Sequence, residues 1–181
     1  MNDLVIQASN PRSLRAFDEE DADILDALQT VFPLRTEHAY MVWDSVPIPL
    51  NYKYTVSYLL PGVLDSLDRL MRDESGSVTS QCPAQEFPAI WHMHWAADEL
   101  QIQFEWRTPP SGTPQILTAH PTLLLSKSAF VSEWKQVLGI ALGALTGAGY
   151  RDEHLCDLAK LRRVYESILE PGVLYRSTTE E

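Results

Sequence analysis

The chain has 181 residues, of which 45% are hydrophobic and 22% are charged, and its formal net charge is −11. This length and composition are typical of a globular protein and predict a single domain over residues 1–181. The negative charge argues against binding to nucleic acids or anionic membranes, because both need a basic protein surface.

Other features of the sequence predict a cytoplasmic protein. The stretch MNDLVIQASNPRSLRAF has no basic start followed by an apolar core, so it does not match a secretory signal. The longest apolar run, VLGIALGALTGAGY, is too short to span a bilayer. Cys82 and Cys156 lie far apart in no metal-binding spacing, and we expect two free thiols.

The stretch FDEEDADILDALQTVF opens with an acidic run and continues with apolar residues at helical spacing. It predicts an amphipathic helix over residues 17–32, with carboxylates in its first turns, where the helix dipole favours them. Pro33 ends this helix. The run is a candidate surface for a basic protein, and the alternative is an ordinary solvated helix face. Its members are Asp18, Glu19, Glu20, Asp21, Asp23 and Asp26.

The next segments alternate between strand and helix patterns. EHAYMVWDSVPIPLNYKYTV predicts a strand at residues 39–43 and an extended edge segment at residues 52–56, with prolines between them. LLPGVLDSLDRLM predicts a helix, because its apolar residues recur at three- and four-residue intervals. A short strand at residues 77–80 follows.

The stretch AIWHMHWAADELQIQFEW predicts a β-hairpin, because apolar residues alternate with polar ones on both sides of AADE. If the hairpin loop has an even number of residues, the apolar residues of the two strands lie opposite one another and share the buried face. The three opposed pairs are Trp95 with Leu100, Met93 with Ile102, and Trp91 with Phe104. A one-residue slip would bury both histidines, and hydrophobic burial opposes it. The polar face of this hairpin therefore carries His92, His94, Gln101, Gln103 and Glu105.

The remaining segments predict a loop, an extended segment and two helices. Residues 108–114 form the loop, and QILTAHPTLLLSK is extended. Ser128 is the expected N-cap of a long helix that ends at GAGY, and a final helix covers residues 152–169. Glycines at positions 139, 143 and 147 share one helix face and predict close approach of another backbone. The fold class is α+β, with an antiparallel sheet of three to five strands and helices packed on one face.

No catalytic motif is present in the sequence. There is no GxSxG elbow, no HExxH or CxxC, and no glycine-rich phosphate loop. SKS, at residues 126–128, suggests a Ser–Lys pair, but helix capping explains Ser128 more simply. We therefore expect no catalytic residues, no cofactor and no enzyme activity.

The histidines of HMH leave a metal-site alternative open. Two imidazoles on one strand face can supply two ligands to zinc or copper. Further ligands would have to come through folding from Glu105, His38, His120 or His154. We expect no metal site and interpret His92 and His94 as part of a polar sheet surface, with a small metal-dependent enzyme as the alternative.

The order of four stretches resembles bacterial immunity proteins of toxin–immunity systems, such as those of contact-dependent growth inhibition. The likeness covers residues 46–176 and rests on strand–helix order and aromatic placement. The stretches are LNYKYTVSYLLPGVLDSLDRLM, IWHMHWAADELQIQFEW, LLLSKSAFVSEWKQVL and ILEPGVLYR.

The resemblance implies a small cytoplasmic protein that binds the C-terminal domain of one cognate toxin, often a basic nuclease, and occludes its active site. An acidic inhibitor suits such a partner, because opposite charge speeds the encounter. Immunity families share no fixed binding residues, so the resemblance assigns no role to any position. A regulatory or scaffold domain is a further alternative.

Overall fold

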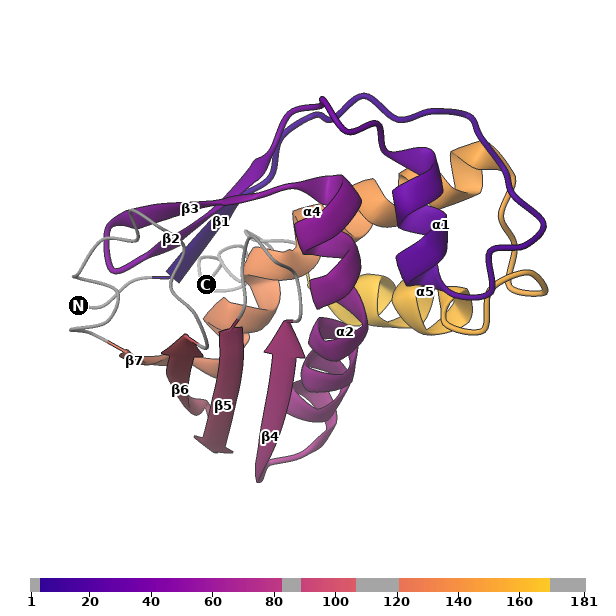
Figure 1. Ribbon diagram of the computed structural model, residues 1–181. Helices are drawn as coiled ribbons and strands as arrows, with labels where there is room; N and C mark the ends of the chain where they lie inside the picture. Colours follow the sequence, from indigo (N-terminus) through magenta and orange to yellow (C-terminus); the bar gives the residue numbers. More distant parts are fainter. Residues whose placement is uncertain (1–3, 83–88, 107–120, 170–181) are drawn as a thin grey trace, which may run out of the picture.

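The computed structural model describes residues 4–82, 89–106 and 121–169. Within them, two antiparallel sheets and several helices form an α+β fold (Figure 1). The smaller sheet has the order β1-β2-β3 and contains β1 (Leu4–Gln7), β2 (Ala39–Trp43) and β3 (Val46–Leu50). The larger sheet has the order β4-β5-β6-β7 and contains β4 (Ser75–Cys82), β5 (Ala89–Ala96), β6 (Glu99–Trp106) and β7 (Thr122–Ser126). The helical elements are α1 (Ile24–Val31), a π-helical turn η1 (Tyr52–Val56), α2 (Ser57–Arg72), α4 (Lys127–Ala148) and α5 (Leu158–Ser167).

The α+β prediction is confirmed, and the strands divide between two sheets rather than forming one. The larger sheet has the predicted number and direction of strands. The smaller one arises because β3 pairs with β2 and β1 pairs with the other side of β2. The loop expected at residues 108–114 lies outside the described residues.

The β5–β6 hairpin has the predicted register. Trp95 lies opposite Leu100, Met93 opposite Ile102, and Trp91 opposite Phe104. All six of these side chains are buried. Burial of three apolar pairs fixes the register, since any one-residue shift would turn them to solvent.

Aromatic side chains join the two sheets to α4. The ring of Trp43, on β2, lies 4.8 Å from that of Phe104, on β6. Trp91 contacts Phe104, and its ring centroid lies 6.2 Å from that of Trp134 on α4. Aromatic pairs at such distances stabilise by about 0.5–1.5 kcal/mol beyond their burial. This cluster forms one core between the sheets and the long helix.

The long helix α4 begins two residues earlier than the sequence predicts. Ser126, not Ser128, is its N-cap, and its hydroxyl accepts a hydrogen bond from the amide of Ala129 at 3.0 Å. The amide of Ser128 instead donates to the Asp98 carboxylate at 2.9 Å, in the turn of the hairpin. Gly149 ends the helix with a φ of 105°, which glycine adopts at no steric cost.

The glycine prediction on α4 is wrong. A Cβ on Gly139 would lie 3.0 Å from the ring of Tyr165, so its neighbour is a side chain on α5. Nothing in the described structure comes within 4 Å of such an atom at Gly143 or Gly147. These two glycines therefore face open space rather than another backbone.

The edge segment expected at residues 52–56 is a π-helical turn, and the edge strand comes before it. Strand β3 contains Pro47 and Pro49, whose side chains are exposed. Proline fits this strand because only one side of it pairs, with β2. Asn51 then caps the turn by accepting from the amides of Lys53 and Tyr54.

The helices predicted at residues 17–32 and 152–169 are both shorter in the structure, and both begin later than predicted. Helix α1 begins after its N-cap Asp23, which accepts from the Asp26 amide at 3.0 Å. The residues before it form a turn in which the Glu20 amide donates to the Asp18 carboxylate at 2.9 Å. Such side-chain bonds offer the backbone an alternative to helix. The final helix likewise begins at Leu158, because residues 152–157 form turns.

Two lysines cap the C-terminal ends of helices with their ammonium groups. Lys53 Nζ donates to the carbonyl oxygens of Gln29 and Phe32, at the end of α1. Lys135 is buried, and its Nζ donates to the carbonyl of Tyr165 at 2.6 Å and that of Ile168 at 2.8 Å. A cation at this end also complements the helix dipole. Among the described helices, none is both long and apolar enough to cross a bilayer.

Replacing Lys135 with methionine tests this capping. Lys135→Met keeps the apolar stem but removes both hydrogen bonds to the end of α5, so we expect the free energy of unfolding to fall by about 2 kcal/mol. Lys160→Met is the matched control, because Lys160 pairs at the surface with Asp65. It should cost less than about 1 kcal/mol. Urea denaturation measures both losses, and equal losses would contradict the capping role.

Candidate functional site

The outer face of the larger sheet is polar, as the hairpin predicts. His92 lies opposite Gln103 and His94 opposite Gln101 in the register of β5 and β6. Both glutamines are exposed, and so is Glu105. The structure therefore brings all five predicted residues of this surface, here called the outer sheet face, onto two adjacent strands.

The ring of His92 is already engaged on both sides. Its Nδ1 lies 3.1 Å from the hydroxyl of Thr79 on β4, and its Nε2 lies 3.5 Å from the Glu105 carboxylate. Metal binding through either nitrogen would break one of these contacts. Within the described residues, no group of three or more His, Cys, Asp or Glu side chains is placed to hold a metal ion.

The other histidines that the structure describes do not complete a metal site. His38 lies with Nε2 3.2 Å from the side-chain nitrogen of Asn51, and His154 accepts from the Arg151 amide at 3.1 Å. His120 lies outside the described residues. The suggested Ser–Lys pair is also absent, because Lys127 Nζ donates to the carbonyl of Asp73 at 3.2 Å.

The acidic segment, residues 18–26, is held in place by one tyrosine. The hydroxyl of Tyr150 accepts from the amide of Asp18 at 3.1 Å and donates to the carboxylate of Asp21. Burial raises the pKa of Tyr150 to about 12, and the hydrogen bond to Asp21 adds to this shift. The segment therefore has a defined conformation even though most of it lies outside α1.

The carboxylates of the acidic segment have no cationic partner in the described part of the chain. None of the ion pairs between described residues involves positions 18–26. The pKa of Asp26 lies above its ordinary value through partial burial, then through repulsion by Asp23 and Asp21. Negative charge is thus concentrated here without neutralisation.

An exposed aromatic side chain borders the acidic segment, and sequence reasoning did not find it. Phe17 is 39% exposed. Its ring lies 4.8 Å from the ring of Tyr150 and 5.0 Å from that of His154. Sequence periodicity places Phe17 at the start of a helix, so only the folded structure reveals this combination of an aromatic ring and carboxylates.

The two predicted surfaces lie apart. In Figure 1, the acidic segment leads into α1 at one end of the molecule, and β4 to β7 lie at the other end. One partner of ordinary size would engage one surface or the other, since a standard interface buries about 800 Å² on each protein.

The comparisons with known proteins return nothing. No protein-family model matches this chain, and no curated protein and no solved structure matches it. A proposal for the function therefore has to rest on the arrangement of this protein's own residues.

Zinc titration tests the alternative metal site. Because His92 is engaged by Thr79 and Glu105 and the described residues place no third ligand near it, we expect calorimetry with zinc chloride to show no stoichiometric binding. The variant with His92→Gln and His94→Gln should give the same trace as the wild type. Binding of one equivalent by the wild type, lost in this variant, would favour a metal site.

Titration of Asp26 tests the charge density of the acidic segment. The folded carboxyl binds its proton more tightly than the unfolded one, so its contribution to stability is present at low pH and is lost as pH rises through its folded pKa. Asp23→Asn keeps a capping side chain but removes a neighbouring charge, and should lower the pKa of Asp26. NMR titration of the carboxyl carbon measures both values. The remote change Glu99→Gln should leave the pKa unaltered, and an equal effect of both changes would contradict local repulsion.

Proposed function

We propose that this protein is a non-catalytic inhibitor that binds a basic protein partner through its acidic segment. The particular function that fits best is that of a cytoplasmic immunity protein, which occludes the active site of a cognate toxin domain such as a nuclease with a basic cleft. The observation that carries the proposal is the group of carboxylates at residues 18–26 without cationic partners in the described structure.

The distribution of cations supports this proposal. Lys53 and Lys135 are used on backbone carbonyls at helix ends. Lys160 and Arg163 pair with Asp65 and Asp68, which joins α5 to α2. Cations thus neutralise carboxylates elsewhere and leave the acidic segment charged. A basic partner would relieve the repulsion around Asp26 and gain long-range attraction during the encounter.

The fixed conformation of the segment also supports protein binding. Tyr150 bonds to both Asp18 and Asp21, and Asp23 caps α1. A surface that is ordered before binding loses less conformational entropy in the complex. Phe17 adds an exposed ring beside these charges, and aromatic side chains at the centre of an interface contribute strongly to affinity.

Charge reversal at two places distinguishes the acidic segment from the outer sheet face. The probe is the protein encoded next to this one, co-expressed and purified with it. The double change Glu19→Lys and Glu20→Lys alters two exposed side chains for which no side-chain bond is observed. We expect the association rate to fall about tenfold at low ionic strength, with a weaker salt dependence, because steering is lost.

The matched control is the double change Glu99→Lys and Glu105→Lys, which alters the net charge equally at the sheet end. Its association rate should change by less than about twofold at physiological salt. Stopped-flow mixing measures the rates, and an activity assay of the partner measures inhibition. A larger effect of the control would move the interface to the outer sheet face. If the neighbouring protein forms no complex and keeps its activity, the immunity function is excluded.

A further inference from the structure

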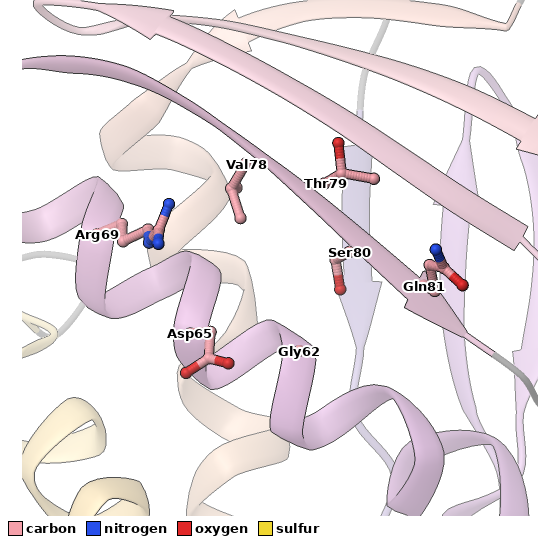
Figure 2. A pocket seen from close by; sticks show the side chains of 7 residues that line it. All are labelled: Gly62, Asp65, Arg69, Val78, Thr79, Ser80 and Gln81. Atoms are coloured by element: carbon pink, nitrogen blue, oxygen red, sulfur yellow. The ribbon is translucent and has the colours of Figure 1, made fainter.

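A cleft of about 400 Å³ runs between α2 and β4. It is lined by Gly62, Asp65 and Arg69 on α2 and by four consecutive residues of β4, 78–81; Figure 2 shows Val78 and Ser80 pointing toward α2 and Thr79 pointing away from it. Neighbouring side chains of a strand point to opposite faces of the sheet. Four consecutive residues can therefore line one cleft only where it follows the edge of the strand, so the backbone of β4 forms one wall.

Among the described residues, none forms a hydrogen bond with the outer backbone edge of β4 at residues 75–80. In the larger sheet β4 pairs on one side only, with β5. In the described structure, the backbone of residues 75–80 makes no hydrogen bond outside that pairing. In an antiparallel edge strand, every second residue directs its N–H and C=O groups away from the sheet. These groups are available to a further strand.

Strand β4 itself lacks the charges, prolines and bulges that often prevent pairing at an edge. β4 has the sequence SGSVTSQC, which contains no charged residue and no proline. By contrast, the edge strand β3 of the smaller sheet carries two prolines. Natural proteins commonly protect edges with charges, prolines or bulges. The absence of such protection along eight residues favours a strand that receives a partner.

Arg69 gives the cleft a positive charge in an otherwise acidic protein. Its guanidinium is exposed and forms no ion pair or hydrogen bond within the described residues. The hydrogen bond from Arg72 lowers the pKa of Asp73, and the charges of Arg72, Arg69 and Lys127 add to this shift. Asp65, the other charged residue of the cleft, is paired with Lys160. Arg69 is therefore available to a carboxylate that enters the cleft.

We propose that this cleft binds an extended segment of a partner protein, which adds to the edge of β4 and places a carboxylate beside Arg69. The backbone of β4 supplies affinity, and Arg69 selects for an Asp, a Glu or a chain terminus. A second copy of this chain fits less well. Symmetric pairing of two β4 edges would bring both α2 helices to the same side of the joined sheet, at the seam. This inference does not depend on the immunity function, because it concerns the opposite end of the molecule.

The test begins with a displayed library of random eight-residue peptides, screened against the full-length protein. The most enriched peptide is then synthesised and serves as the probe. We expect it to contain Asp or Glu. Its dissociation constant should rise about tenfold for Arg69→Gln and stay within about twofold for Arg72→Gln, the matched control on the same helix. Replacing the acidic residue of the peptide by its amide should raise the dissociation constant for the wild type by a similar factor. The same replacement should change the dissociation constant for Arg69→Gln little.

Methylation of single backbone nitrogens in the peptide tests strand addition directly. Binding should be lost at every second position and kept between them, because only alternate amides face β4. The proposal is overturned if no peptide is enriched, if Arg69→Gln binds equally well, or if methylation shows no alternation. It is also overturned if hydrogen exchange shows every amide of residues 76–80 already protected in the free protein, since its own chain or a second copy then occupies the edge.

Discussion

The contact between the two sheets, made by Trp43 and Phe104, is the interaction on which the rest of the structure depends. Through Trp91 and Trp134 it extends to the long helix α4, so both sheets and this helix share one core. The aromatic rings fill the inner faces and fix the register of the β5–β6 hairpin. The polar side chains of β5 and β6 consequently lie on the outer face, and no described strand pairs with the free side of β4.

The positions of the lysines and arginines determine where negative charge remains on the surface. The chain has 14 lysines and arginines against 25 acidic residues. Lys53 and Lys135 are used at helix ends, and others join α5 to α2. The acidic segment has no ion pair within the described residues and is held by Tyr150. Its charges are thus fixed in position while they repel each other, which favours a basic partner.

Hydrophobic periodicity predicted much of the fold, and it was most accurate where the burial of apolar side chains determines the structure. The hairpin register follows from six alternating apolar residues, because any other pairing exposes them. The strand at residues 39–43 is confirmed for the same reason. Errors occur where short polar side chains decide. The side chains of Asp18 and Asp23 accept backbone hydrogen bonds, so helix α1 begins only at residue 24. The carboxylate of Asp98 accepts from the amide of Ser128, and Ser126 caps α4 instead.

The candidate sites divide in the same way. The sequence correctly placed His92, His94, Gln101, Gln103 and Glu105 on one sheet face. It did not reveal the ring of Phe17 beside the acidic segment, the contacts of His92, or the cleft between α2 and β4. Each of these depends on contacts between residues far apart in the chain, which periodicity within one segment does not describe.

Hydrogen exchange on the complex with the neighbouring gene product tests the central claim most directly. The backbone amides of residues 17–26 should exchange more slowly in the complex than in the free protein, and those of β5 and β6 should change little. Protection confined to the outer sheet face, with residues 17–26 exchanging as in the free protein, would contradict the claim that this protein acts through its unpaired carboxylates.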